Sequence, residues 1–276
     1  MAQRPPTPGP DEIPDTPLLK YFRSPLFKGP KGKKWGANRI AEATKWCNNP
    51  DQLAAWFAES TAAFERCYYN CQPFHPRGHS FSDTHGQSLA KTADVAKRLS
   101  KRDVWEVPND SRLDFRYLDR EIEIARSKPA PKTPPDAQLI VDLFLANASD
   151  RTPILCEIKI GTDECAFYAL IQLLTQAAYA ATPGQRARLV LFGSQPDFVL
   201  REAVPGSPAP IDLYILLVAP TKGGPYDEIT TLAIRLSKKL VADTRVRSKI
   251  RRIAWLEGQD DGNGGLSLSA LPAGTP

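Results

Sequence analysis

Two charged residues interrupt a short apolar segment of the sequence, ILCEIKI at 154–160. Glu157 and Lys159 are separated by one residue, so the alternation of side chains along a β-strand places them on the same face. A buried charge is costly unless it is paired or bound to a metal. The apolar segment before it, LIVDLFL, also carries one charged residue, Asp142. These three side chains are therefore the first candidates for chemistry.

The two apolar segments are joined by ANASDR, whose Asn, Ser and Asp residues favour a turn. An antiparallel hairpin with its turn centred between Ser149 and Asp150 places Asp142 directly opposite Glu157. Directly opposed residues have Cβ atoms about 5 Å apart. The hairpin therefore predicts two carboxylates and the amine of Lys159 at one spot on an otherwise apolar sheet.

Two carboxylates at that distance repel each other, and a hard divalent cation would compensate for the repulsion. We therefore expect Mg²⁺, or Mn²⁺, to be bound by Asp142, Glu157 and the backbone carbonyl of Ile158. Lys159 would then hold or deprotonate an attacking water, while the metal stabilises the charge that develops on a phosphodiester.

This pattern of an Asp on one strand, Glu157-Ile158-Lys159 on the next and a helix afterwards resembles the PD-(D/E)XK nuclease superfamily. The resemblance covers roughly residues 115–195 and implies the αβββαβ core of the restriction-endonuclease-like fold. It implies that Asp142 and Glu157 bind Mg²⁺ and that Lys159 assists the nucleophilic water. The function that it implies is phosphodiester hydrolysis, in DNA rather than RNA, with endonuclease and exonuclease activity both open.

The segment 163–182 is predicted to form the helix after the motif, and four of its polar and aromatic residues are spaced to share one face. A glutamine on this helix, often followed by a tyrosine, resembles the exonuclease-type branch of the superfamily, in which the glutamine reaches into the site. Gln172 is the first choice for that residue and Gln176 the second. The four residues are Tyr168, Gln172, Gln176 and Tyr179.

Some features depart from the family pattern. The literal Pro-Asp pair is Pro135-Asp136, which lies too far from the turn to face Glu157, so Asp142 is preferred. Many family members also take an acid from the first helix, and the choice among such acids here leaves one or two metal ions open. The other acids that could contribute are Asp94, Glu121 and Glu123.

The apolar patterns predict an α/β fold with a mixed central sheet and an N-terminal helical extension. Strands are expected at 115–127, 137–146, 153–160, 187–193, 212–220 and 252–257, and helices at 51–69, 86–102, 163–182 and 228–241. The expected domain organisation is a disordered, proline-rich leader at 1–17, a basic and aromatic arm with helices at 18–105, a nuclease-like core at 106–257 and a flexible tail at 258–276.

Clusters of basic residues are candidates for phosphate contacts. One lies in the N-terminal arm, where lysines alternate with aromatic rings, and one on the expected helix at 86–102. The alternative is that the aromatic residues of the arm pack on the body and that its lysines are solvated. The candidate nucleic-acid-binding residues are Lys31, Lys33, Lys34, Lys97, Arg98, Lys101 and Arg102.

Four possible zinc ligands, Cys67, Cys71, His75 and His79, are spaced four residues apart. Zinc-finger ligand pairs are usually separated by a longer loop, and two prolines interrupt any helix that would align all four side chains. Buried cysteines and loop histidines are therefore the preferred interpretation, and Zn²⁺ is not the expected metal.

Composition limits the other function classes. The formal net charge of +5 permits an anionic partner, and five cysteines without a disulfide spacing favour a cytoplasmic protein with reduced thiols. No apolar run is long enough to cross a membrane, and no glycine-rich phosphate loop follows an expected strand. The rival interpretation is a nuclease-fold protein without turnover that acts as a nucleic-acid-binding or scaffold module, and a homodimer is compatible with either.

Overall fold

A six-stranded mixed sheet runs through the molecule, with its strands side by side in chain order. The first three strands form an antiparallel meander, the fourth and fifth run parallel to the third, and the sixth is antiparallel to the fifth. The strands are β1 (Phe115–Glu123), β2 (Ile140–Asn147), β3 (Pro153–Ile160), β4 (Ile211–Val218), β5 (Ile250–Asp260) and β6 (Leu266–Ala270).

The computed structural model describes most of the chain. The described residues are 14–24, 36–66, 81, 89–124, 139–161, 166–194, 196–201, 210–220, 223, 225–263 and 265–271. Within them no helix is both long and apolar enough to cross a membrane.

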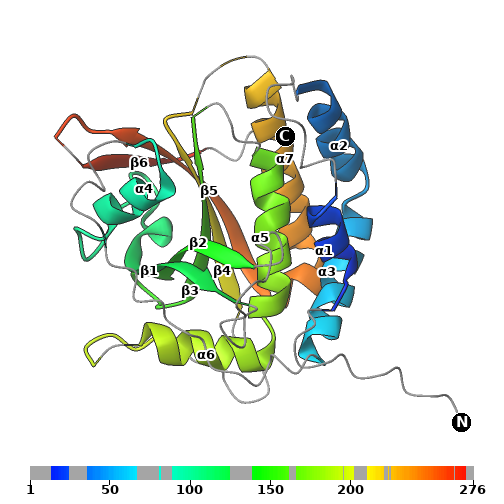
Figure 1. Ribbon diagram of the computed structural model, residues 1–276, viewed down its shortest axis with the longest axis horizontal. Helices are drawn as coiled ribbons and strands as arrows, with labels where there is room; N and C mark the ends of the chain where they lie inside the picture. The colour runs from blue at the N-terminus through cyan, green and yellow to red at the C-terminus, as the bar shows by residue number, and fades with distance from the viewer. Residues whose placement is uncertain are drawn as a thin grey trace, which may run out of the picture.

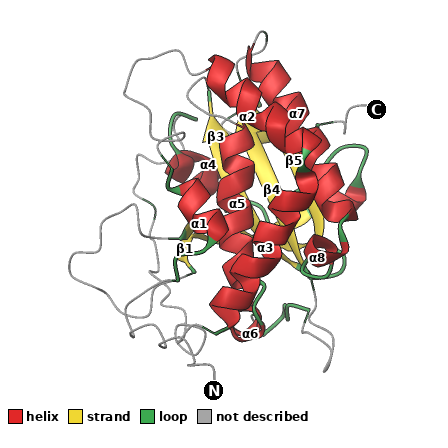
Figure 2. Ribbon diagram, turned by 90° about the vertical axis from the view of Figure 1, so that its right-hand side faces the viewer, coloured by secondary structure: helices red, strands yellow, loops and turns green. Residues whose placement is uncertain are grey.

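Eight α-helices of the described chain surround the sheet unequally. Helix α4 packs on one face, whereas α5 and α7 cover the other face and carry α1, α2 and α3 as an outer layer (Figures 1 and 2). The helices are α1 (Pro17–Phe22), α2 (Gly36–Asn48), α3 (Pro50–Glu65), α4 (Thr92–Leu99), α5 (Ala166–Ala180), α6 (Pro183–Gly193), α7 (Pro225–Ala242) and α8 (Thr244–Arg247).

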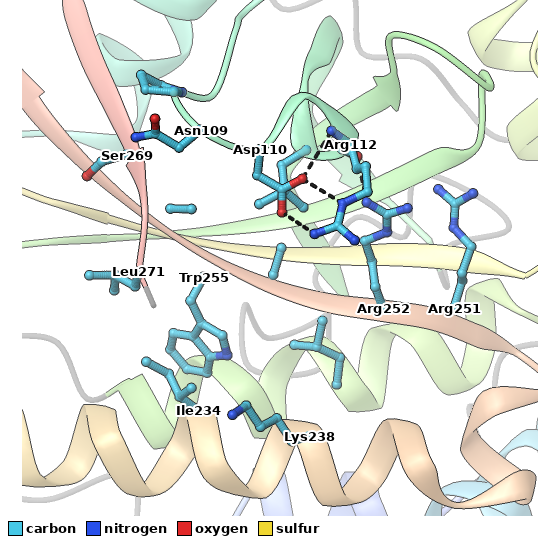
Figure 3. A pocket seen from close by; sticks show the side chains of 15 residues that line it. Asn109, Asp110, Arg112, Ile234, Lys238, Arg251, Arg252, Trp255, Ser269 and Leu271 are labelled. Atoms are coloured by element: carbon cyan, nitrogen blue, oxygen red, sulfur yellow. Dashed lines mark hydrogen bonds and ion pairs between the residues drawn. The ribbon is translucent and has the colours of Figure 1, made fainter. Parts of the chain in front are cut away.

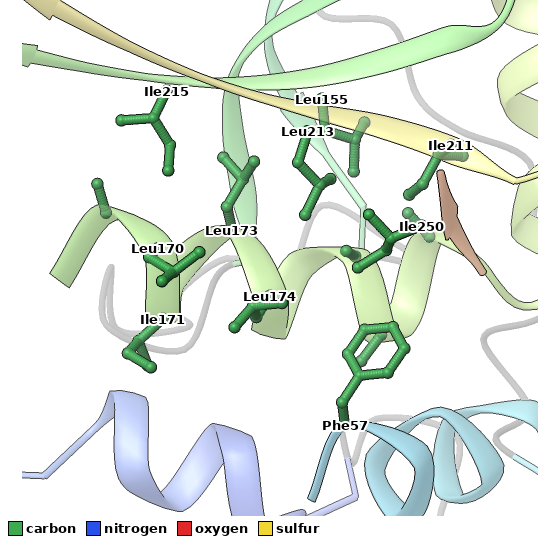
Figure 4. Packing of buried hydrophobic residues seen from close by; sticks show 14 of the residues in the cluster. Phe57, Leu155, Leu170, Ile171, Leu173, Leu174, Ile211, Leu213, Ile215 and Ile250 are labelled. Carbon is green, nitrogen blue, oxygen red and sulfur yellow. The ribbon is translucent and has the colours of Figure 1, made fainter. Parts of the chain in front are cut away.

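Helix α5 is the centre of the larger core. Thirteen of its fifteen residues are buried, as expected of a helix that is apolar all round and enclosed by other elements. Leu170, Leu173 and Leu174 lie between sheet residues such as Leu213 and the ring of Phe57 from α3 (Figure 4). The sheet and the N-terminal helices are therefore held together through α5.

Most of the predicted elements are confirmed. The strand expected at 153–160 has those limits, and the other strands of the meander, the strand at 212–220 and the helices at 51–69, 86–102, 163–182 and 228–241 are present with shifted ends. The result is an α/β fold with a mixed sheet and additional N-terminal helices.

The strand predicted at 187–193 is wrong, because these residues belong to α6. Thr182 and Pro183 begin a helix, since proline is favoured at the first helical position. Within it Leu189 and Val190 are buried while Leu191 is 79% exposed. A short apolar run fits a buried strand or one side of a helix equally well, and here the helix forms.

The predicted limits of both terminal segments also need correction. Thr16, assigned to the disordered leader, is buried and its hydroxyl accepts a hydrogen bond from the Leu19 amide at the start of α1. The predicted tail contains the end of β5 and all of β6, where Leu266 and Leu268 are buried and the serines beside them are exposed. That period of two indicates a strand, but the surrounding glycines concealed it. Residues 1–13 and 272–276 lie outside the described chain.

The first part of the arm expected at 18–105 contains two helices, α1 and α2. Its aromatic residues pack inward: the hydroxyl of Tyr21 accepts a 2.7 Å hydrogen bond from Trp46 and donates one of 2.9 Å to Glu42. Trp56 of α3 completes the cluster, 4.9 Å from Trp46 between ring centroids. For these rings the alternative of packing on the body is confirmed.

A network of charged residues links β4, β5 and the β2–β3 turn at the end of the sheet where β3 begins. Arg251 of β5 donates from Nε to the fully buried carboxylate of Asp212 in β4 at 2.9 Å, and it also pairs with Asp150 in the β2–β3 turn. Burial raises the pKa of Asp150, but hydrogen bonds from Arg251 and from the Thr152 amide outweigh it, so the pKa lies below its ordinary value.

Replacement of Leu174 by alanine should lower the free energy of unfolding by about 2–5 kcal/mol, because it leaves a cavity between α5 and its neighbours. Leu191→Ala is the matched control, since that side chain is exposed on α6, and should change the value by less than about 0.5 kcal/mol. Urea unfolding followed by circular dichroism measures both. Equal effects of the two substitutions would contradict the central position of α5.

Replacement of Asp150 by asparagine should lower stability at neutral pH. Because the pKa of Asp150 is lowered by folding, its contribution is present above the unfolded-state pKa and is lost as the pH falls through the folded-state value. The difference between wild type and variant should therefore shrink below about pH 4. Asp110→Asn, which breaks an exposed pair with Arg112, is the control and should cost less.

Candidate active site

The β2–β3 hairpin has the predicted register. The paired residues run from Ala146 opposite Pro153 to Leu143 opposite Cys156, and one step further along the same register Asp142 opposes Glu157. In the turn, the side chain of Asn147 accepts a hydrogen bond from the Asp150 amide at 3.1 Å. Turn chemistry and the alternation of apolar residues therefore fix the position of the candidate acids.

The two strands separate at this point. Their pairing ends at Leu143 and Cys156, although both strands continue beyond it. The Ile158 amide donates instead to Oδ2 of Asp142 at 2.9 Å, so a side chain replaces the strand partner. Because the N–H and C=O of one strand residue point in the same direction, the Ile158 carbonyl also faces β2 beside Asp142.

Glu157 and Lys159 form a buried ion pair. Their side chains are 2% and 9% exposed, and Nζ of Lys159 lies 2.9 Å from Oε1 of Glu157. Both residues lie on the face of the sheet that α5 covers, as does the neighbouring Leu155. The second carboxylate oxygen of Glu157, Oε2, is buried and has no hydrogen-bond partner among the described residues.

The surroundings of Glu157 disfavour its charged form. Burial raises its pKa well above the ordinary value, and the charge of Asp142 acts in the same direction. The charge of Lys159 and its hydrogen bond to Glu157 act in the opposite direction, but the pKa stays raised. A further cation near Oε2 would favour the carboxylate, and this is the property expected of a metal ligand.

Helix α5 opens towards solvent only at this cluster. Tyr168 and Gln172 are its two residues that are not fully buried, and both contact Lys159. Oε1 of Gln172 lies 3.4 Å from Nζ of Lys159, and the centroid of the Tyr168 ring lies 5.3 Å from the same nitrogen. Gln172 therefore occupies the position expected of it.

Gln176, the second choice, has a different position. It is buried and donates from Nε2 to the backbone carbonyl of Ile140, so it links α5 to the start of β2, near Asp142. The contact of Tyr168 with Lys159 was not predicted. The spacing of four residues between Tyr168 and Gln172 was the signal that could have found it.

The other candidate acids, named above as possible metal ligands, do not share the position of Asp142 and Glu157. In the register of β1 and β2, Glu121 opposes Asp142, but its φ of 51° breaks the strand geometry and its side chain pairs with Arg120 at 3.2 Å. Asp94 is buried on α4, across the sheet from Glu157. Glu123 is described for its backbone only, and Asp136 lies outside the described chain.

The sequence raised two metal hypotheses, a magnesium site and a zinc site. Among the described residues, no group of three or more His, Cys, Asp and Glu side chains is arranged to share a metal ion. A magnesium site here would thus rest on two carboxylates and the Ile158 carbonyl, as expected. The four possible zinc ligands, Cys67, Cys71, His75 and His79, lie outside the described residues.

The candidate basic surface is divided. Arg98 is 2% exposed, pairs with Asp260 at 3.0 Å and donates to the Gly265 carbonyl at 2.6 Å, so its guanidinium is directed into the fold instead of towards a phosphate. Lys101 and Arg102 are exposed and Lys97 is half-buried, but α4 lies on the opposite face of the sheet from Glu157. Lys31, Lys33 and Lys34 lie outside the described residues.

A separate pocket of about 640 Å³ lies between α7, the start of β5 and residues 108–113 (Figure 3). None of the cluster residues lines it. Its arginines are already engaged: Arg112 pairs with Asp110, and Arg251 and Arg252 pair with Asp212. We therefore assign the candidate chemistry to the Glu157 cluster and not to this pocket.

Comparison with known proteins gives no assignment. No protein-family model matches the chain, and neither the curated proteins nor the solved structures contain a match. The functional argument therefore rests on the geometry of the site.

Replacement of Lys159 by methionine should lower the free energy of unfolding at neutral pH by about 3–5 kcal/mol, because it leaves the buried carboxylate of Glu157 without its cation. The deficit should shrink as the pH falls, since the raised pKa allows Glu157 to become neutral by taking up a proton. Chemical unfolding at several pH values measures this. The double variant Glu157→Gln/Lys159→Met should recover part of the loss, and no recovery would contradict the coupling.

Proposed function

We propose that the chain is a Mg²⁺-dependent nuclease of the restriction-endonuclease-like fold that hydrolyses phosphodiester bonds in DNA. The observation that carries the proposal is the position of Asp142 opposite Glu157, with Lys159 on the same face at the open point of α5. The order α4, β1, β2, β3, α5, α6, β4 also supports the αβββαβ core implied by the sequence resemblance, with α6 as an additional helix before β4.

The residues present fit a magnesium ion. Mg²⁺ prefers oxygen ligands and usually takes one or two carboxylates together with waters and phosphate oxygens. Asp142 and Glu157 supply the carboxylates, and the carbonyl of Ile158 is directed to the same side of β3. The buried Oε2 of Glu157, which has no hydrogen-bond partner among the described residues, supports this proposal, because a cation beside it would stabilise the carboxylate. Bound there, Mg²⁺ would stabilise the negative charge that develops on the phosphate.

The remaining groups suit the handling of water. Lys159 is held by Glu157 and Gln172, so its ammonium is fixed in direction and can donate to a water or to a phosphate oxygen. Gln172 is half-buried at the same place and carries both a donor and an acceptor. Solvent can reach this side of the cluster, because Asp142, Tyr168 and Gln172 are all only half-buried.

One observation favours a second candidate, a nucleic-acid-binding or scaffold protein that keeps the fold without turnover. The ammonium of Lys159 and one carboxylate oxygen of Glu157 already satisfy each other, so the pair is stable as it stands. Binding without cleavage would need only the exposed basic residues, such as Lys101 and Arg102. The two candidates differ in whether any substrate is turned over.

Linear, circular and single-stranded DNA and RNA should be incubated with the protein and Mg²⁺, Mn²⁺ or EDTA. Cleavage of DNA is expected with either metal and none with EDTA. Asp142→Asn, Glu157→Gln and Lys159→Met should each lower the rate roughly 100-fold or more, since each removes a group that acts on the reacting phosphate or water. Gel-resolved initial rates measure the effect.

Asp103→Asn and Lys45→Met are matched controls, because each removes the same kind of charge at an exposed position away from the cluster. Both should keep the rate within about threefold, since neither residue is a candidate phosphate contact. Cleavage that persists in EDTA, or that persists in the three cluster variants, would contradict the proposed mechanism. Binding of DNA with no cleavage under any condition would favour the scaffold candidate.

A further inference from the structure

The aromatic ring of Tyr168 lies beside the ammonium of Lys159 at the one place where α5 is not fully buried. The ring centroid is 5.3 Å from Nζ, within the range in which the negative face of an aromatic ring attracts a cation. Lys159 is bound from three sides, by Glu157, by Gln172 and by this ring. The first two contacts are hydrogen bonds to oxygen, and the third limits the remaining freedom of the side chain.

Tyr168 is in turn held by an element from the beginning of the chain. Its ring stacks on that of Phe22, the last residue of α1, with 5.5 Å between ring centroids and 15° between the planes. Leu18 and Leu19 anchor α1 in the core, where it contacts both α3 and α5. Phe22 cannot easily leave Tyr168 while α1 remains docked.

We propose that Tyr168 is a positioning residue for Lys159 and that Phe22 supports it, so that α1 forms part of the candidate active site. The contact itself is independent of any activity, but its consequence for catalysis rests on the proposed nuclease function. The N-terminal helix then has a role at the site through packing. Its basic neighbours in the sequence are not needed for that role.

The variants separate the ring from the hydroxyl. Tyr168→Phe keeps the ring face, Tyr168→Leu removes it, and Phe22→Leu removes only the stacking partner. Phe192→Leu is the matched control, because Phe192 is also a half-buried aromatic residue but lies on α6, where its ring contacts Phe144. Circular dichroism and thermal unfolding verify that each variant is folded.

The first measurement does not depend on cleavage. A proton above a ring face resonates upfield, so the ε-methylene of Lys159, labelled with ¹³C and assigned with Lys159→Arg, should be shifted upfield in the wild type. Tyr168→Leu should abolish the shift, Phe22→Leu should reduce it, and Tyr168→Phe and Phe192→Leu should preserve it. If Tyr168→Leu does not fold, Phe22→Leu still tests the contact. An unchanged shift in the folded leucine variants would overturn the proposal.

The second measurement is the rate of DNA cleavage. Tyr168→Leu should lower kcat roughly 3- to 30-fold, the range of a cation–π contact, with KM within about twofold, whereas Tyr168→Phe should restore kcat. Loss of the upfield shift with no change in kcat would overturn the positioning role. Loss of the shift in a protein whose wild type cleaves no substrate would support the contact and reject the nuclease function.

Discussion

The buried ion pair between Glu157 and Lys159 is the interaction on which the arrangement of the site depends. Both charges lie in an apolar strand beneath an apolar helix, where neither would be stable alone. Their presence requires that the surrounding elements supply further polar partners at the same place. Gln172 and Tyr168 meet that requirement from α5, whereas Asp142 of β2 adds a second carboxylate that disfavours the charged form of Glu157. The polar groups of three elements converge because one strand brings two charges into the core.

The part of the site that lies on β2 and β3 could be predicted from the sequence because local rules determine it. Side chains alternate with a period of two, and the turn residues set the register, so the positions of Asp142, Glu157 and Lys159 follow from the hairpin alone. Gln172 was suggested instead by the resemblance to the nuclease superfamily, since helical spacing only grouped it with Tyr168, Gln176 and Tyr179 on one face of the helix. Local rules could not find the separation of β2 from β3, which depends on a hydrogen bond between the Asp142 side chain and the Ile158 amide.

The remaining errors arose where tertiary contacts decide between two local possibilities. The apolar run in α6 fits a strand as well as a helix, and only packing selects the helix. The charge of Arg98 suggested a phosphate contact, but Asp260 in β5 and the Gly265 carbonyl take up its guanidinium. Both partners lie more than 150 residues away in the sequence, so the helix pattern alone could not reveal them. The contact of Phe22 with Tyr168 was not predicted either, because it depends on the docking of α1.

Stability alone gives no reason for the ion pair. A buried pair of charges gains little or nothing over well-packed apolar residues of similar volume, because the cost of removing both from water offsets their attraction. Leucine or isoleucine at the two positions would fit the neighbouring core of α5 and β4, which consists of such residues. Oε2 of Glu157, which is buried without a hydrogen-bond partner among the described residues, adds a further unfavourable group at the same place. The site therefore lowers the stability of the isolated fold, while it opens to solvent beside Gln172 and Tyr168 and presents two carboxylates. These properties are better explained by binding of a ligand than by a contribution to stability.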